Sequence, residues 1–273
     1  MKRRTLLLFV LSGWMSASAQ TLLLKNGTTL PAGGLVRNGD LIMTSVKTSN
    51  GGSGQVGYSI SDIVELDLPI PAEITAARDN LATGNYQHAL LTIDPVLKYQ
   101  KTIRDIPGNW WAQAALIEIE ALAGLNRGPE ASTLVSEISI YSKDPQILAS
   151  AKLQIALTTD FPDSAQAFAA YDAILAESTD PDTISRAWIA EGDLRLAQHE
   201  IEQALMDYLT VTVFFPEHNP LLPRALWGAS QAYTKLKDAA NATKANQTLA
   251  SSYPDSPEAA LAREQLQKKV NNP

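Results

Sequence analysis

The chain has 273 residues, of which 45% are hydrophobic and 7% aromatic, and it contains no cysteine. This composition is typical of a folded protein and excludes the disordered, collagen-like and disulfide-scaffold classes. The formal net charge of -7 disfavours binding to nucleic acid and to anionic lipid surfaces, because both require a basic face.

Residues 1–19 have the three parts of a secretory signal peptide. A basic start at Met1 to Arg4 precedes an apolar run at 6–11, and a small-x-small cleavage site follows at 17–19. The apolar run is shorter than the roughly 18 residues needed to span a bilayer, so we expect cleavage before Gln20, export, and no membrane insertion. Without cysteine the exported chain can form no disulfide and carry no lipid on a cysteine.

Residues 20–71 are expected to form a small all-β domain. Short apolar runs alternate with turn signals, and Asn26-Gly27 between two such runs is the strongest type of hairpin signal. The expected strands cover 21–25, 35–37, 41–47, 55–60 and 63–67. Their order resembles the small SH3-like or Sm-like β-barrels at the start of some exported bacterial proteins. Because so short a domain buries little surface, we expect it to pack against its neighbour.

Pro69-Ile70-Pro71 marks the change from strands to helices, since these prolines cannot continue a sheet ladder and Pro71 suits the start of a helix. The domains are therefore the signal peptide 1–19, the β-domain 20–71 and a helical repeat domain 72–270. Alanine, leucine and helical periodicity dominate the last of these. We expect five helical pairs, at 72–101, 109–142, 145–178, 183–216 and a fifth ending at Pro254, and then a closing helix over 257–269.

Two segments of the helical part repeat one pattern of large and small residues. A 34-residue tetratricopeptide repeat reads W-x2-L-G-x2-Y, then A-x3-F, then P. The first copy departs from this pattern at Glu191 and Arg195. The first copy matches at Trp188, Gly192, Ala204, Tyr208 and Pro216. The second copy runs Leu226-x2-Ala229-Ser230-x2-Tyr233, then Ala242-x3-Asn246, then Pro254, and it supplies the tyrosine that the first copy lacks. Residues 183–256 thus resemble tetratricopeptide repeats, which implies an α-solenoid whose small residues let paired helices approach closely.

The same region, with its ending Tyr253-Pro254-Asp255-Ser256-Pro257, resembles the repeat domains of two bacterial envelope families. These are the Tol-Pal-associated cell-division coordinator and the lipoprotein of outer-membrane barrel assembly. The resemblance implies a periplasmic location, with secretion as the alternative, and binding to another envelope protein. The coiled-coil start of the first family and the lipid-bearing cysteine of the second are missing, so neither specific role is carried over.

No sequence motif indicates catalysis or a cofactor. The glycines within 52–57 fit the spacing of the dinucleotide fingerprint, but that fingerprint requires a helix after them, and 56–60 is expected to be a strand. The motifs of a P-loop, a serine-nucleophile elbow and a zinc protease do not occur. His88, His199 and His218 have acidic partners only as immediate chain neighbours, which point about 100° away on a helix. We therefore expect a non-enzymatic protein that holds no cofactor and no metal.

The expected binding surface is the inner wall of the solenoid, which the first helix of each pair lines. Counting from the small-residue positions places eight side chains there: Arg186, Ile189, Asp193 and Leu196 in the fourth pair, and Arg224, Trp227, Gln231 and Lys235 in the fifth. Trp227 suits a binding hot spot, although a tryptophan on a helix more often belongs to the core. The pairs at 110–111 and 214–215 are expected to pack between repeats.

These features predict an exported, non-catalytic adaptor that binds a protein or peptide segment of the cell envelope in the groove of its helical repeats. The alternative is a secreted ligand-binding or enzyme-accessory protein in which the β-domain holds a glycan or peptide and the helices support it. No sequence pattern specifies an oligomeric state.

Overall fold

The computed structural model describes residues 20–47, 51–216 and 220–271, so the expected signal peptide 1–19 and His218 lie outside the described residues. The described chain divides into two compact units. The β unit comprises 20–74 and 95–111, and the helical unit comprises 75–94 and 112–271. The mainly α fold with a small β N-terminus is as predicted, but the contacts assign 95–111 to the β unit rather than to the helical part.

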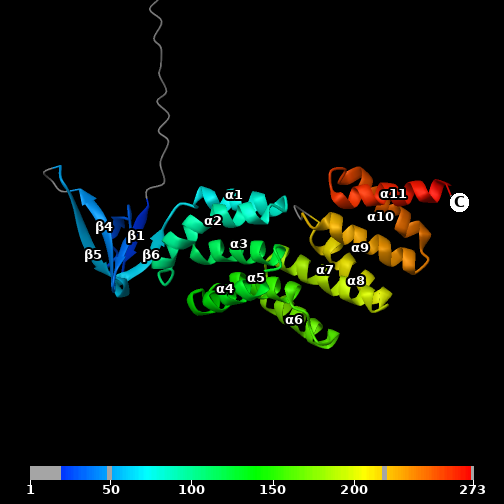
Figure 1. The fold of residues 1–273 in the computed structure, drawn as a ribbon, viewed down its shortest axis with the longest axis horizontal. Helices are drawn as coiled ribbons and strands as arrows, with labels where there is room; N and C mark the ends of the chain where they lie inside the picture. Colours follow the sequence, from blue (N-terminus) through cyan, green and yellow to red (C-terminus); the bar gives the residue numbers. More distant parts are fainter. Residues whose placement is uncertain (1–19, 48–50, 217–219, 272–273) are drawn as a thin grey trace, which may run out of the picture. The chain divides into compact units, whose positions relative to one another are not determined.

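The β unit has six strands in two antiparallel three-stranded sheets, ordered β2-β1-β6 and β3-β4-β5 (Figure 1). The strands are β1 (Thr21–Leu24), β2 (Thr29–Pro31), β3 (Val36–Asn38), β4 (Leu41–Lys47), β5 (Ser53–Ser59) and β6 (Ile63–Asp67). The Asn26-Gly27 turn does form a hairpin, with Gly27 at a φ of 82°. Its second strand is β2, which the sequence analysis missed because it is three residues long and ends in proline.

The core of the β unit is completed by the connection that follows α2 (Tyr86–Gln100). Ile103 and Ile106 from this connection are buried with the strand residues Leu22, Ile42 and Leu66. The Leu66 N–H donates to the carbonyl of Pro107 at 2.8 Å. Because β6 is an edge strand of its sheet, this bond joins the connection to the edge of the sheet. A sheet pair of this size cannot bury a full core alone, which explains why residues 95–111 belong with it.

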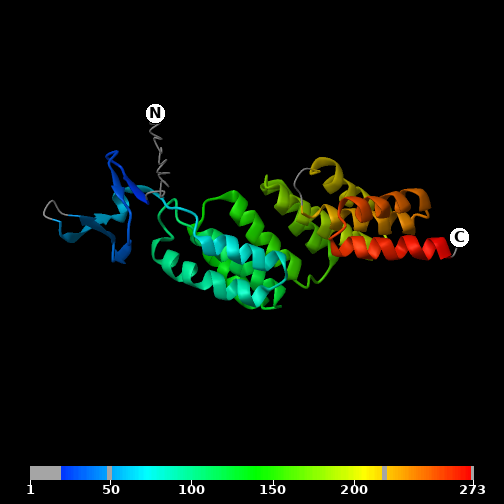
Figure 2. The same ribbon diagram turned by 90° about the horizontal axis from the view of Figure 1, so that it is seen from above.

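The helical part forms five hairpins and a closing helix, as expected (Figures 1 and 2). With α2, the described helices are α1 (Ala72–Ala82), α3 (Trp111–Gly124), α4 (Gly128–Tyr141), α5 (Pro145–Thr158), α6 (Ser164–Glu177), α7 (Pro181–Ala197), α8 (Ile201–Phe214), α9 (Leu222–Lys235), α10 (Ala239–Ser252) and α11 (Pro257–Asn271). From α4 onward each helix packs on the next, and the first helices α5, α7, α9 and α11 also contact one another in succession. This contact pattern is that of a helical repeat.

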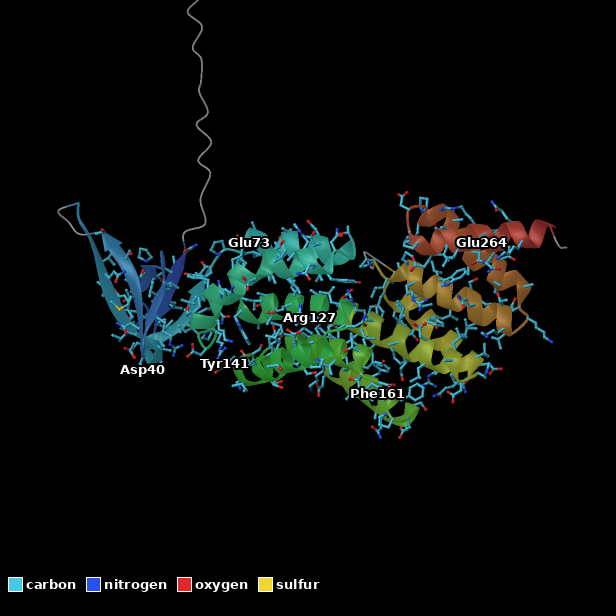
Figure 3. All side chains as sticks on the ribbon, in the orientation of Figure 1. Asp40, Glu73, Arg127, Tyr141, Phe161 and Glu264 are labelled. Carbon is cyan, nitrogen blue, oxygen red and sulfur yellow. The ribbon has the colours of Figure 1, made fainter. Side chains whose placement is uncertain are left out.

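Four of the five inner turns share one backbone geometry, which makes the repeat visible without any sequence motif. A residue just after the first helix has a φ between 58° and 73° in each of them, and the next N–H donates to the carbonyl five residues back at 2.8 or 2.9 Å. This is the Schellman pattern of helix termination. The left-handed residues are Gly84, Asn126, His199 and Lys237. Arg127, labelled in Figure 3, follows Asn126 in the turn of the second hairpin. The third hairpin lacks this geometry, because its two helices are joined by the longer loop at 159–163, which contains Phe161 (Figure 3).

The connections between hairpins also repeat. Ser142 and Ser178 end α4 and α6, and each accepts at its Oγ from the N–H of an aspartate two residues on, at 3.2 and 3.1 Å. These aspartates, Asp144 and Asp180, then cap α5 and α7, each of which starts with proline. The same four-residue solution thus sets the start of two consecutive first helices.

Large rings pack against small residues where successive helices meet. The Tyr208 ring of α8 lies between Gly192 of α7 and Gly228 of α9, and a β-carbon at either glycine would lie within 3.0 Å of it. Similarly, a β-carbon at Gly124 would lie 2.6 Å from the ring of Tyr86. The absence of a side chain therefore allows the helices to approach closely.

Of the two aromatic pairs expected to pack between repeats, the pair at 110–111 belongs to the β unit instead. Trp111 is 1% exposed, and Trp110 donates from Nε1 to the carbonyl of Leu68 at 3.0 Å. Phe214, however, is 72% exposed, so its predicted packing between repeats is wrong: it ends α8 on the face that also carries the exposed Met206 and Val213. In the described residues, no helix is both long and apolar enough to cross a membrane.

Candidate binding groove

The first helices of four consecutive hairpins line a groove of about 740 Å³. Each helix contributes one face, because the lining residues recur three or four positions apart. On α3 these are Gln113, Leu116, Ile117, Glu120, Ala123 and Gly124, and on α5 they include Ser150, Leu153 and Gln154. The lining also includes Arg78 on α1 and Asp182 and Arg186 on α7.

The polar groups of the groove differ in how well they are partnered. Arg186 donates from Nε to Asp182 Oδ2 at 2.8 Å, so its charge is engaged on its own helix. Glu120 accepts only from Gln154 Nε2, at 3.2 Å, within the described residues. Burial raises the pKa of the Glu120 carboxyl, and Arg186 partly opposes that rise. A half-buried carboxylate with one neutral donor is an incompletely satisfied acceptor.

Gln113 lies two turns before Glu120 on the same face of α3. Its Oε1 is buried and meets no hydrogen-bond donor among the described residues. Since buried polar atoms are normally bonded, Gln113 is a second unsatisfied acceptor along this groove. Gln146 of α5 shows the opposite behaviour, because its Oε1 accepts from the N–H groups of Thr179 and Asp180 at 2.9 and 3.0 Å.

A second cavity, of about 340 Å³, lies between α7 and α9. Five of the eight predicted wall residues line it together: Asp193, Leu196, Arg224, Gln231 and Lys235. The Asp193 carboxylate accepts from Tyr208 Oη at 2.7 Å and from Arg224 Nη2 at 2.6 Å. Burial, and then the bond to Asp193, raise the pKa of the Tyr208 hydroxyl. Two of the predicted binding groups thus pair with each other.

The other three predicted wall residues lie elsewhere. Arg186 lines the first groove instead. Ile189 is 7% exposed and belongs to the core around Tyr208. Trp227 is half-buried and lines neither this cavity nor the first groove. Counting along α7 and α9 therefore brings five of the eight side chains to one cavity, and Ile189 belongs to the core instead.

Sequence reasoning missed a buried charge cluster at the start of the fourth hairpin's turn. Arg195 Nε lies 2.9 Å from Asp207 Oδ2, and its Nη2 lies 3.6 Å from Glu191 Oε1. Burial raises the pKa of Asp207 to about 7, which Arg195 partly opposes. The Arg195 guanidinium also lies 4.9 Å from the Phe168 ring centroid, close enough for a cation–π contact. The sequence does contain a sign of this cluster, because Glu191 and Arg195 occupy the motif positions at which a tetratricopeptide repeat has Leu and Tyr.

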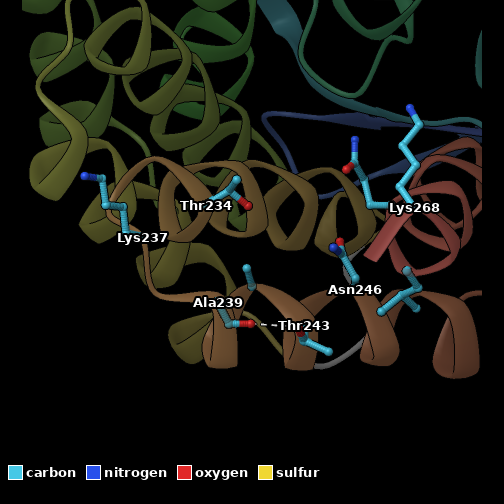
Figure 4. Close-up of a pocket in the computed structure, with 9 residues that line it drawn as sticks. Thr234, Lys237, Ala239, Thr243, Asn246 and Lys268 are labelled. Carbon is cyan, nitrogen blue, oxygen red and sulfur yellow. Dashed lines mark hydrogen bonds between the residues drawn. The ribbon is translucent and has the colours of Figure 1, made fainter. Parts of the chain in front are cut away.

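A third cavity, of about 370 Å³, lies beside α9, α10 and α11 (Figure 4). Its polar lining is largely engaged within the unit. Thr243 Oγ1 donates to the carbonyl of Ala239 at 2.7 Å, and Asn246 Oδ1 accepts from Ser230 Oγ at 2.8 Å. Lys268 forms an ion pair on α11. Among the described residues, none of its buried polar side-chain atoms lacks a hydrogen bond, in contrast to Gln113 in the groove of the first helices.

The described histidines do not converge on any of these cavities. His88 lies in the first turn of α2, and His199 is the left-handed residue of the α7–α8 turn. Among residues 20–47, 51–216 and 220–271, no three His, Cys, Asp or Glu side chains are grouped closely enough to hold a metal ion.

The chain matches no protein-family model, and no curated protein sequence is significantly similar to it. The resemblance to tetratricopeptide repeats therefore rests on the sequence pattern alone, and the structure shows a helical repeat.

Proposed function

We propose that the protein is an exported, non-catalytic adaptor that holds a protein or peptide segment of the cell envelope in the groove lined by α1, α3, α5 and α7. The observation that supports this is the continuity of the groove across four consecutive first helices. Neighbouring helices pack roughly 10 Å apart, so the groove spans about 30 Å. That length corresponds to about nine residues of extended chain, which favours a segment over a small molecule.

In-cell photo-crosslinking tests this proposal. A photoreactive amino acid replaces either Leu116, which lines the groove, or Ser136, which is exposed on α4. We expect a specific envelope protein to be captured from position 116 only. Ser150→Trp, which places a bulky ring in the groove, should abolish that capture while leaving the helical circular dichroism signal intact. The same captured protein from both positions, or capture that survives Ser150→Trp, would contradict the proposal.

The alternative, in which the β unit holds the ligand, has one observation in its favour. Val36 and Leu41 are 53% and 42% exposed and share a face of the β3-β4-β5 sheet with Met43, which is directly opposite Val36. The double variant Val36→Ser, Leu41→Ser separates the two functions. It should leave capture at position 116 unchanged if the groove binds the partner, and abolish capture if the sheet does.

A further inference from the structure

We infer that the groove selects segments that carry a lysine or arginine, whose cationic head pairs with Glu120. This inference rests on the proposed function and adds the chemistry of the ligand to it. It depends on three features of the described residues: the incomplete partnering of Glu120, the state of the cations around it, and the charge of the surrounding helices.

Glu120 is held in place from the neighbouring repeat. Gln154, which is 6% exposed, donates from α5 to Oε1 of Glu120 on α3 at 3.2 Å. No hydrogen bond reaches the second carboxylate oxygen from the residues that the structure describes. The side chain is thus oriented but keeps acceptor capacity, and a charged donor from a ligand forms stronger bonds with a carboxylate than a neutral amide does.

The cations near Glu120 do not replace such a donor. Arg186 lowers the pKa of Glu120 more than any other cation does, but its Nε is bonded to Asp182 at 2.8 Å. Arg78 is exposed on α1 and attracts Glu120 less strongly than Arg186 does. Burial remains the largest influence on the Glu120 carboxyl and raises its pKa. A bound ammonium or guanidinium would offset this desolvation and lower the pKa again, so ligand binding and ionisation of Glu120 favour each other.

The helices that carry the groove are acidic as a group. Helices α1, α3, α5 and α7 contain 7 acidic and 4 basic side chains, whereas residues 221–271 contain 4 acidic and 7 basic ones. A net negative charge on the binding region raises the local concentration of cationic segments and speeds their association. Together with the acceptor at Glu120, this charge distribution favours a basic segment over an acidic or neutral one.

The test selects random phage-displayed peptides on the purified chain and measures synthetic copies by fluorescence polarisation. We expect the selected peptides to contain lysine or arginine. Glu120→Gln should weaken their binding about tenfold, as should replacement of the peptide's lysine by norleucine, and the two changes together should weaken it no further. Glu118→Gln is the matched control, because Glu118 lies on the same helix outside the groove lining, and binding should be unchanged.

The outcomes separate this inference from the proposed function. Selected peptides without basic residues, or basic peptides indifferent to Glu120→Gln, would overturn the inference. If Ser150→Trp still abolished binding of those peptides, the proposed function would stand. Failure to select any peptide, or binding that Ser150→Trp leaves intact, would overturn the proposed function and this inference together.

Discussion

The two cavities that share α7 differ in how their polar groups are partnered. In the groove of α1, α3, α5 and α7, Glu120 and Gln113 keep acceptor atoms that no described donor reaches. In the cavity between α7 and α9, Asp193 receives donors from both Tyr208 and Arg224. Both cavities are lined by first helices, yet only the first holds a buried side-chain acceptor that no described donor reaches.

This difference shows that a position on the inner wall does not by itself make a side chain available to a partner. The Tyr208 ring fits between Gly192 and Gly228, and this close packing brings the charges of α7 and α9 within bonding distance of each other. In the groove of the first four hairpins the Tyr86 ring packs against Gly124, but Glu120 and Gln113 still keep open acceptors. Three substitutions test how α7, α8 and α9 are held together. They change the ring of Tyr208, the buried carboxyl of Asp207 and the exposed ion pair of Arg224.

Tyr208→Ala removes the ring that closes the second cavity and should have the largest effect. Tyr208 is 0% exposed, and the glycines on either side have no side chain that could fill the space. We expect the free energy of unfolding, measured by urea denaturation, to fall by about 3–5 kcal/mol. Tyr208→Phe is the matched control: it keeps the ring and loses only the bond to Asp193, so it should cost about 1 kcal/mol. Equal losses in both variants would show that the hydroxyl, rather than the ring, holds these helices together.

The fold was largely predictable because its signals are local. Proline after aspartate, as at Asp180-Pro181, marks a helix start, and the expected hairpins agree with the observed ones to within a few residues. What failed were features that depend on distant contacts. The assignment of Ile103 and Ile106 to the β unit follows from an incomplete sheet core, and no periodicity within residues 95–111 indicates it.

The site was less predictable, for a related reason. Counting along a helix gives the face of a side chain but not its partners, so it placed Asp193 and Arg224 correctly and could not show that they pair. From the sequence, Glu118 and Glu120 on their alanine-rich helix are both interpreted as carboxylates on a solvated face, so the groove position of Glu120 is not predicted. The hydrogen bond that Glu120 accepts from Gln154 of the next repeat is what distinguishes it from a solvated carboxylate.

Asp207→Asn should change the pH dependence of stability by an intermediate amount. The pKa of Asp207 rises from 3.8 to about 7 on folding, so between these values the folded chain binds a proton that the unfolded chain does not. The free energy of unfolding therefore falls as the pH rises from about 4 to 7, by at most about 1.4 kcal/mol per pH unit. The asparagine side chain of the variant cannot titrate, so the variant should lack this component.

Urea denaturation of parent and variant at several pH values isolates the contribution of Asp207, because the other carboxyls titrate in both proteins. The difference in stability between variant and parent should grow from pH 4 to 7 and then level off. A difference independent of pH would show that Asp207 is already ionised across this range, and that Arg195 outweighs the cost of burial.

Arg224→Ala should have the smallest effect, because the ion pair with Asp193 is 41% exposed on both sides. We expect a loss of less than about 1 kcal/mol in the free energy of unfolding, which shrinks further in about 1 M salt. Lys235→Ala is the control, since Lys235 lines the same cavity and forms no ion pair with any described residue; its replacement should leave stability unchanged. A loss of several kcal/mol would make Arg224 an anchor of the fold. Loss of partner capture at unchanged stability would instead make this cavity a binding wall, and the pairing of Asp193 with Arg224 would then be a resting arrangement that a ligand displaces.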